Sequence, residues 1–275
     1  MAACVNLVPV PDPRPIRPPV DAAAVVPGWR LEVLTESPST NADVARRASS
    51  GEPAGLVLVA EHQTAGRGRL DRVWVTPPRV ALTFSLLLAP DAVPLSRWSW
   101  LPLLSGLAVV EGVGRAAGVD AVLKWPNDVL VGEQKVAGVL VERVERSGQG
   151  GSRAVAVVGV GLNVSATRAE LPVASATSLA LAGATSLDRT ALLVAVLDAF
   201  SRRYDAWQAA GGRGLRPSYE RACSTLGRRV RVQLPAGGTL TGTAVGVDDD
   251  GRLRVDDGAR VHVLGAGDVV HVRPT

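Results

Sequence analysis

Short runs rich in β-branched residues, each ending at turn residues, constrain the fold of this chain more than any other feature. Four such runs lie between residues 122 and 160, separated by residues such as Gly132 and Gly148. Runs of this length are typical of strands, and short connections join antiparallel neighbours. Together with three earlier apolar runs they predict a mixed, largely antiparallel sheet, with strands over residues 30–35, 56–61, 80–88, 122–124, 129–131, 136–144 and 155–160.

Longer segments between these runs have the apolar spacing of helices. Residues 40–49 predict a helix with Ser39 or Thr40 as its N-cap, because a hydroxyl there accepts a hydrogen bond from the first unpaired amides. Residues 101–117 predict a long helix, and residues 189–210 carry the clearest amphipathic pattern in the chain. A further helix is expected to begin near Pro217. The fold class expected is therefore α+β, with helices packed on a mixed sheet.

The two ends of the chain differ in composition from this body. The first 27 residues include seven prolines, which fix φ and remove amide donors too often for a helix or central strand, so we expect a flexible or draped tail. From Arg228 onward, short strands with frequent Gly and Asp predict a small β-barrel of about 45 residues. The expected domains are a tail over 1–27, a body over 28–226 and a barrel over 227–275.

Composition narrows the classes of function. The chain has 275 residues, 47% hydrophobic and 20% charged, which is typical of globular proteins. The net charge is only +4, and the basic residues are scattered apart from a cluster over 67–72, which argues against a DNA-coating protein and favours a local anion site. Cys4 and Cys223 are too few for a disulfide framework or a cysteine-built zinc site, so a reducing cytoplasm is expected. No signal pattern and no apolar run of the ~18–20 residues that span a bilayer is found, so neither secretion nor membrane insertion is expected.

The basic cluster lies in the sequence EHQTAGRGRLDRVW, residues 61–74. Its glycines let backbone approach a ligand closely, and its arginines offer forked donors for phosphate or carboxylate. The segment is expected to be a loop that binds an anion. A solvated basic turn or an RNA-binding tract of the Gly-Arg type is the alternative that this segment alone leaves open.

Three further segments carry residues suited to chemistry. KWPND, residues 124–128, combines a cation with Asp128, a carboxylate able to hold Mg²⁺, although an Asn-Asp turn is the commoner role of that dipeptide. KVAGVLVE, residues 135–142, begins with a lone lysine that either reaches a ligand or protects a sheet edge. In VGVGLNV, residues 158–164, two glycines at period 2 bare one face of a strand, leaving a slot for a flat ring or marking a bulge.

Taken in order, these segments resemble the biotin protein ligases. The family pattern is a Ser-Thr-Asn turn, a GRGRxxRxW loop, KWPND, K[LV]AGxLxE and a GxGxN strand. The chain has Ser39-Thr40-Asn41, residues 66–74, 124–128, 135–142 and 159–163 in that order. The resemblance implies the family's catalytic domain, similar to class II aminoacyl-tRNA synthetases, followed by a small barrel like Src-homology-3 domains. It covers nearly everything after the proline-rich tail.

The resemblance also implies roles for individual residues. The group expected to hold biotin comprises Ser39, Thr40, Asn41, Gln63, Gly66, Arg67, Lys135, Gly138, Gly159 and Gly161. The group expected to hold ATP comprises Arg69, Arg72, Trp74, Lys124, Asn127, Asp128, Lys135 and Asn163, with Asp128 as the Mg²⁺ ligand. Lys135, Arg69 and Arg67 are the expected catalytic residues. No signature marks the segment that would cover adenine after Asn163.

The activity implied is two-step. Biotin and ATP would give biotinyl-5′-AMP and pyrophosphate, and a lysine of the biotin carboxyl carrier domain of an acyl-CoA carboxylase would then accept the biotinyl group. Family members that repress transcription carry an N-terminal helix-turn-helix domain, for which the proline-rich residues 1–27 are too short, so no DNA binding is expected. Partners in the family dock along a sheet edge, which is also compatible with a weak homodimer. A lipoate- or octanoate-transferring enzyme and a nucleic-acid-binding module stay as alternatives.

Overall fold

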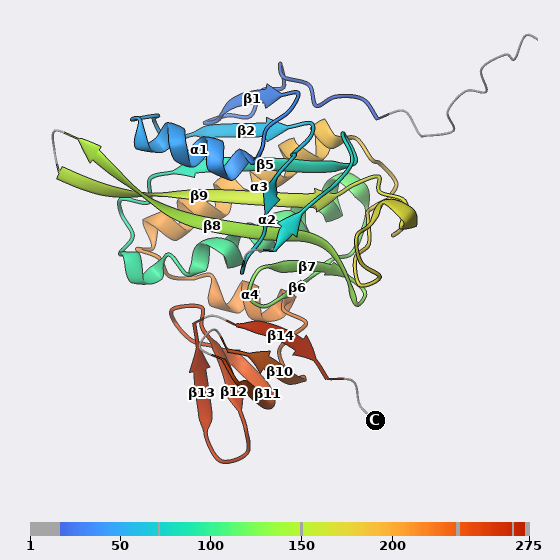
Figure 1. Ribbon diagram of the computed structural model, residues 1–275. Coiled ribbons are helices and arrows are strands. Elements are labelled where there is room, and N and C mark those ends of the chain that lie inside the picture. The colour runs from blue at the N-terminus through green and yellow to red at the C-terminus, as the bar shows by residue number, and fades with distance from the viewer. Residues whose placement is uncertain (1–16, 71, 149–150, 235–236, 266, 273–275) are drawn as a thin grey trace, which may run out of the picture.

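The computed structural model describes residues 17–70, 72–148, 151–234, 237–265 and 267–272. It forms a layered α/β body with a smaller antiparallel sheet below it (Figure 1). The strands of the body are β1 (Arg30–Leu34), β2 (Leu56–Ala60), β3 (Gly66–Arg67), β4 (Val73–Trp74), β5 (Ala81–Leu88), β6 (Val122–Lys124), β7 (Asp128–Val131), β8 (Gln134–Gly148) and β9 (Gly151–Asn163).

The main sheet has seven strands in the order β1-β2-β5-β9-β8-β7-β6. Only β1 and β2 run parallel among these neighbours, and the other pairs are antiparallel, as the short connections predict. Strands β8 and β9 are longer than expected and form one extended hairpin, so Gly148 lies at a strand end. Since β9 pairs with β5 on one side and β8 on the other, Gly159 and Gly161 of β9 lie in the middle of the sheet.

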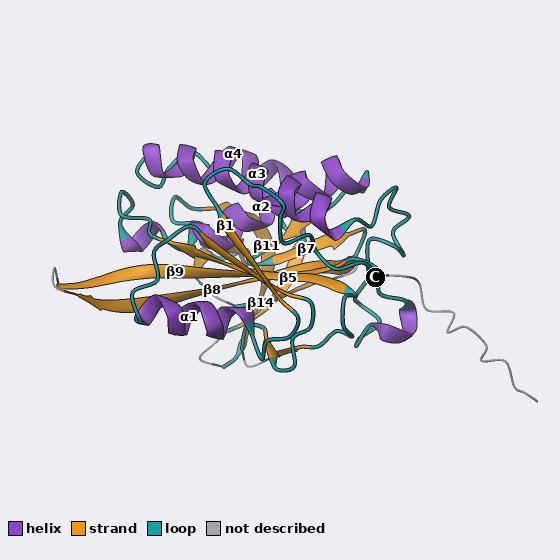
Figure 2. Cartoon of the chain, turned by 90° about the horizontal axis from the view of Figure 1, so that it is seen from above, coloured by secondary structure: helices purple, strands orange, loops and turns teal. Residues whose placement is uncertain are grey.

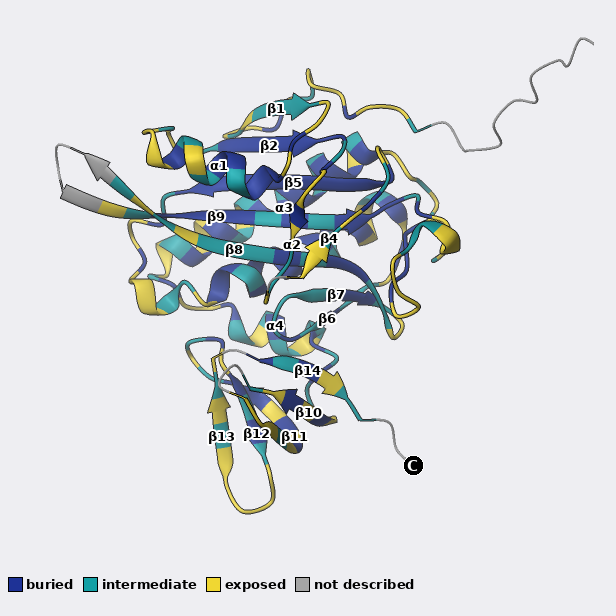
Figure 3. Ribbon diagram, viewed as in Figure 1, coloured by how far each residue is buried: buried dark blue, intermediate teal, exposed yellow. Residues whose placement is uncertain are grey.

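Helices cover both faces of this sheet. Helices α2 (Trp100–Ala117), α3 (Arg189–Ala209) and α4 (Arg216–Ala222) lie on one side, and α1 (Thr40–Ser49) lies on the other (Figure 2). The predicted helices are thus confirmed to within a residue or so, and Ser39 caps α1 by accepting from Ala42 N. The central strands β2 and β5 are buried along their whole length, which explains their continuous apolar runs (Figure 3).

The C-terminal sheet contains five antiparallel strands, as expected. They are β10 (Arg229–Gln233), β11 (Thr239–Val247), β12 (Leu253–Asp256), β13 (Val261–Leu264) and β14 (Asp268–His271). Their order is β13-β12-β11-β10-β14, and within the described residues no pairing of β13 with β14 closes the sheet into a barrel. Two tryptophans of the body form hydrogen bonds to the turn between β11 and β12. Trp100 Nε1 donates to Asp249 O at 2.8 Å, and Trp125 Nε1 donates to Gly251 O at 3.1 Å.

Residues 17–27 of the proline-rich tail drape over the body. Val20 and Val26 are buried in the main core. The amide of Val20 donates to Glu61 at 2.8 Å, and Arg189 donates to the carbonyl of Pro18 at 2.5 Å. Residues 1–16 of the expected tail lie outside the described residues, and the two domain boundaries stay predictions.

Among the helices that the structure describes, none combines the length and the apolar character needed to cross a membrane.

Candidate functional site

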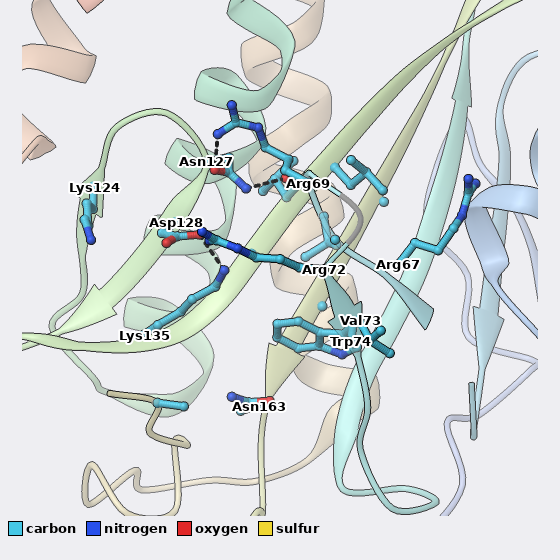
Figure 4. A pocket seen from close by; sticks show the side chains of 18 of the residues that line it. Arg67, Arg69, Arg72, Val73, Trp74, Lys124, Asn127, Asp128, Lys135 and Asn163 are labelled. Carbon is cyan, nitrogen blue, oxygen red and sulfur yellow. Dashed lines mark hydrogen bonds and ion pairs between the residues drawn. The ribbon is translucent and has the colours of Figure 1, made fainter. Parts of the chain in front are cut away.

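A cavity of about 680 Å³ opens on the face of the main sheet that carries α1, where the predicted motifs meet. Its walls come from the arginine segment, β7, β8, β9 and the first turn of α1, with β14 of the C-terminal sheet at one side. Every site residue predicted from the sequence lines it except Gly66. Figure 4 labels ten of the lining residues, and the side chains of Arg72 and Lys135 lie beside Asp128.

The arginine segment was expected to be a loop, and the structure adds a pair of two-residue strands to it. In this short hairpin of β3 and β4, Gly66 pairs with Trp74 and Arg67 with Val73. A side chain at Gly66 would bring a Cβ within 2.4 Å of Trp74 O and 2.8 Å of Gln63 Nε2. Gly66 therefore serves this hairpin pairing, and the two short strands escaped sequence reasoning because two-residue strands carry no periodic pattern.

Gly159 and Gly161 of β9 leave a bare strip, as their spacing predicts. Trp74 lies across it, since a Cβ on Gly161 would come within 2.5 Å of the indole. A Cβ on Gly159 would come within 2.1 Å of Asn41 Oδ1. The indole Nε1 of Trp74 is buried and, within the described residues, has no hydrogen-bond partner. The strip is therefore a slot between the sheet and the arginine hairpin, and the structure gives no sign of a bulge at these glycines.

The slot ends in a buried polar wall. Gln63 Oε1 accepts from the amide and hydroxyl of Thr40, at 2.8 and 3.0 Å. The Ser85 hydroxyl lies 2.7 Å from Thr40 Oγ1 and 2.6 Å from Asn41 Oδ1. These side chains come from α1, β5 and the segment after β2, so the start of α1 presents alternating donors and acceptors to one end of the cavity.

The opposite end is cationic. Lys135 Nζ lies 2.6 Å from Asp128 Oδ1 and 5.9 Å from the centre of the Trp74 ring. Arg69 donates to Asn127 Oδ1 at 2.9 Å, and Asn127 Nδ2 donates to Val139 O at 2.9 Å. In Figure 4 the Arg72 side chain extends over Asp128 towards Lys135.

Burial disfavours the charged forms of Lys124 and Arg69, two cations at this end of the cavity. Burial lowers the pKa of the Lys124 ammonium, and Lys135 and Arg72 lower it further, while Asp128 raises it. Burial is also the first cause that lowers the pKa of the Arg69 guanidinium. Cations held out of water among other cations favour an anionic guest, because a phosphate or carboxylate supplies the missing counter-charge.

The side chains of Arg67 and Asn163 make contacts outside this cationic group. In Figure 4 the guanidinium of Arg67 points away from Asp128, and it pairs with Glu142 at 3.0 Å. Asn163 is buried, and its Nδ2 donates to Thr177 O at 3.0 Å. The segment after Asn163 runs beside β8, where Lys135 N donates to Ser175 O and Thr177 N donates to Lys135 O, both at 2.8 Å. This segment adds Pro172, Val173, Ser175 and Ala176 to the cavity.

Other residues at the site were missed by sequence reasoning. Asp268 on β14 pairs with Arg72, and Val269 and Val270 also line the cavity. These three lie more than 190 residues from the arginine segment, so no local motif could connect them. Ser85 sits in a strand that is apolar except for Thr83 and itself, and a buried hydroxyl was the only available signal.

Asp128, the Mg²⁺ ligand predicted from the sequence, lines the cavity. Among the described residues, no three His, Cys, Asp or Glu side chains gather as a metal cage. Asp128 is a single hard oxygen donor with Lys135, Arg69 and Lys124 nearby. Mg²⁺ is commonly held by one or two carboxylates, with nucleotide phosphates completing its shell. The residues therefore fit Mg²⁺ that arrives with a nucleotide.

The sequence is similar to known biotin ligases over both parts of the chain. Residues 32–163 match the Biotin/lipoate A/B protein ligase family, and residues 225–272 match the biotin protein ligase C terminal domain. The chain is 40% identical over 270 residues to the biotin–[acetyl-CoA-carboxylase] ligase of Mycobacterium tuberculosis, covering 94% of this chain and 98% of that protein. It is 32% identical to the bifunctional ligase/repressor BirA of Bacillus subtilis, covering 84% of this chain and 70% of that protein.

A solved structure of the biotin protein ligase from Aquifex aeolicus, in complex with biotin and ATP, superposes with a TM-score of 0.73. It is 30% identical in sequence, and the match covers 89% of this chain and 99% of that chain. Together with the identity to the mycobacterial ligase over nearly the whole chain, this shows that the chain belongs to the biotin protein ligase family.

Proposed function

We propose that the chain is an ATP-dependent biotin protein ligase. It activates biotin as biotinyl-5′-AMP with release of pyrophosphate and then transfers the biotinyl group to a lysine of the biotin carboxyl carrier domain of an acyl-CoA carboxylase. The observation that carries the proposal is the juxtaposition, in one cavity, of a glycine-floored slot with a polar end wall and a cationic cluster. A small acid and a nucleotide can thus meet at Lys135.

Biotin is assigned to the slot. Its ureido ring carries two N–H donors and one carbonyl acceptor, and the wall formed by Thr40, Asn41 and Gln63 offers both kinds of partner. Gly138, Gly159 and Gly161 let Lys135, Asn41 and Trp74 lie close to the sheet, so the rings would pack against these three side chains. Ser39 caps α1 and Gly66 pairs within the hairpin, at the edges of the slot. Arg67 lies at the hairpin's outer side, where its role is to hold the hairpin over biotin.

ATP is assigned to the cationic end. Arg69, Arg72 and Lys124 face the position of its phosphates, with Asn127 orienting Arg69. Asn163 and the segment over residues 172–176 border the space left for the nucleoside. Asp128 would hold Mg²⁺, which neutralises phosphate charge when bound.

The first chemical step joins two anions. An oxygen of the biotin carboxylate attacks the α-phosphorus of ATP, the bond from that phosphorus to the bridging oxygen breaks, and pyrophosphate leaves. Lys135 lies between slot and cationic end, so its ammonium neutralises the carboxylate and the α-phosphate together as they approach. Arg69 and Arg72 offset the charge that develops on the leaving pyrophosphate.

The second step uses the acceptor's lysine. Its neutral amine attacks the acyl carbon of the mixed anhydride, the acyl–oxygen bond breaks and AMP leaves. Trp74 and the arginine hairpin cover the slot, which shields the anhydride from water until the amine arrives.

The proposal is tested with purified chain, biotin, ATP and Mg²⁺. Pyrophosphate release must depend on biotin, and biotinyl-5′-AMP must be recovered from the protein when no acceptor is present. Lipoate and octanoate are run in parallel, since one matching family also contains lipoate ligases. Release that depends on lipoate and not on biotin would refute the choice of acid, and release with none of the acids would refute the activity.

A further inference from the structure

One carboxylate behind the cavity wall joins two parts of the site. Glu142 lies on β8, outside the residues that line the cavity. Its Oε2 accepts from Asn41 Nδ2 at 2.8 Å and from Arg67 Nη2 at 3.0 Å. Asn41 belongs to the first turn of α1 and Arg67 to β3, so a single oxygen connects the polar wall with the arginine hairpin.

This contact fixes the orientation of the Asn41 amide. Asn41 is buried, and its Nδ2 also donates to Leu140 O at 3.3 Å. Its Oδ1 accepts from the Ser85 hydroxyl at 2.6 Å and lies over Gly159. With both donors of the amide directed at Glu142 and Leu140, the carbonyl oxygen is the end that faces the slot.

The orientation decides which ligands the slot accepts. A carbonyl oxygen has two lone pairs, so Asn41 Oδ1 can accept a second hydrogen bond beside that from Ser85. A flipped amide would face a ring N–H with two donors, and a buried donor without an acceptor costs free energy. A cyclic urea therefore needs the orientation that Glu142 imposes.

Arg67 receives its position from the same oxygen. The guanidinium is half exposed, with 49% of its side chain accessible, so the ion pair alone contributes little to stability. Its effect is geometric, because Arg67 pairs with Val73 through the backbone of the hairpin that carries Trp74 over Gly161.

We propose that Glu142 is a positioning residue, which acts through Asn41 and Arg67 to select a cyclic-urea ring in the slot and to keep the hairpin closed above it. The inference rests on the proposed function for the identity of the ligand. Glu142 touches neither biotin nor ATP in this scheme.

The primary test is Glu142→Gln, which keeps the size of the side chain and removes its charge. Calorimetric titration should show biotin binding weakened about tenfold, because the neutral amide is a poorer acceptor and brings a competing donor next to Asn41. The KM for ATP and the rate of adenylate formation at saturating biotin should change by less than about twofold. Glu142→Asp, which keeps the charge, should regain part of the affinity.

The matched control is Glu145→Gln, the same chemical change three residues along β8, on a carboxylate that pairs with Arg143. It should bind biotin as the unaltered chain does. If both variants weaken biotin and ATP alike and lower the midpoint of thermal unfolding, Glu142 has a structural role only and the inference is wrong.

A double-mutant cycle tests whether Glu142 acts through Asn41. Asn41→Ala should weaken biotin binding, and adding Glu142→Gln to it should weaken binding by clearly less than tenfold, because only the contact of Glu142 with Arg67 is then left to lose. If Glu142 and Asn41 acted independently, the double variant would show the product of the two single losses in biotin affinity.

A second experiment exchanges the carboxylate and the amide between positions 41 and 142, and it keeps the proposal testable if Glu142→Gln folds poorly. Asn41→Asp alone places two carboxylates side by side and should weaken biotin more than tenfold, by about the cost of an unmet charged hydrogen bond. Combined with Glu142→Gln, whose amide can donate to the new carboxylate, it should recover at least part of that loss. No recovery would contradict the proposal.

The failure of this inference can be told apart from the failure of the proposed function. An unaltered chain that binds no biotin would refute the proposed function. A chain that binds biotin, with an affinity that Glu142→Gln does not change, would refute this inference alone.

Discussion

The ammonium of Lys135, at the start of β8, lies 2.6 Å from Oδ1 of Asp128, at the start of β7. Asp128 is thus the counter-ion of Lys135 before a nucleotide enters. When phosphates and Mg²⁺ arrive, the cation and the carboxylate each gain a new partner, so the pair is suited to opening on substrate binding.

Lys135→Ala is therefore expected to reduce adenylate formation by at least about 100-fold, a size typical of removing one charged group from a developing transition state. The side chain is one-third exposed, so the fold should persist. Biotin-dependent pyrophosphate release measures the loss, and circular dichroism checks the fold. A folded variant that retains activity within a few fold would show that Lys135 is not at the reacting atoms.

Arg69→Gly is expected to release the adenylate early. Arg69 anchors the turn of the arginine hairpin through Asn127, so its loss should loosen the cover on the slot. Labelling of a bystander protein's lysines should rise. The chain's own mass is an internal check, because its only two lysines, Lys124 and Lys135, both line the cavity and leave no surface lysine to label. Unchanged release of the adenylate would exclude the hairpin as the lid.

Gly161→Ala is expected to displace the Trp74 indole, since the new methyl group would lie 2.5 Å from the ring. Biotin binding should weaken by about tenfold or more, comparable to ~1–3 kcal/mol of overpacking. Gly114→Ala in α2 is the control, because its Cβ meets only Val119 O, at 4.0 Å. It should leave biotin binding intact and stabilise the helix by about 0.5–1 kcal/mol. Equal effects of the two changes on biotin would argue against a slot at Gly161.

Lys124→Met is expected to stabilise the free chain at neutral pH. Burial lowers the pKa of Lys124 in the folded state below its unfolded value. The folded state then binds fewer protons, so the destabilisation is present while both states are charged and is relieved as pH rises through the folded pKa. The gain of the variant in urea unfolding should shrink at alkaline pH, and its affinity for ATP should fall. A gain that grows with pH would contradict the assignment.

Arg189→Leu is expected to destabilise the fold by up to about 3–5 kcal/mol, because it leaves the buried Glu61 carboxylate with only its longer ion pair to Arg79, at 3.4 Å. The two side chains are 4% and 6% exposed and 2.7 Å apart, and they join the start of α3 to the residue that follows β2. Denaturant titration measures the cost. The double variant Glu61→Leu with Arg189→Leu should be less destabilised than the single one. An equal or larger loss would place the cost in packing and not in the ion pair.

The fold was largely predictable because its signals are local. Periodic apolar runs indicated the long helices and the main strands, and the short connections indicated antiparallel pairing. The hairpin of residues 66–74 was not predictable, since its pairing depends on the glycine that lets Trp74 approach and not on alternation. Closure of the C-terminal sheet was expected from strand spacing alone, which carries no information about the pairing of β13 with β14.

For the site, the residues on contiguous motifs were predictable and their partners were not. Lys135, Asp128 and Gly161 each lie in a recognisable segment, and all three line one cavity. Asp268 reaches Arg72 only because the C-terminal sheet packs against the body, and Glu142 meets Arg67 across 75 residues of sequence. Such contacts arise from tertiary packing, so a motif shows them only after the fold is known.

The most direct test is the intact mass of a biotin carboxyl carrier fragment after incubation with the chain, biotin, ATP and Mg²⁺. The account predicts an increase by one biotinyl group on one lysine, lost when biotin or ATP is omitted and lost with Lys135→Ala. An unmodified fragment, under conditions where a known biotin ligase labels it, would contradict the account.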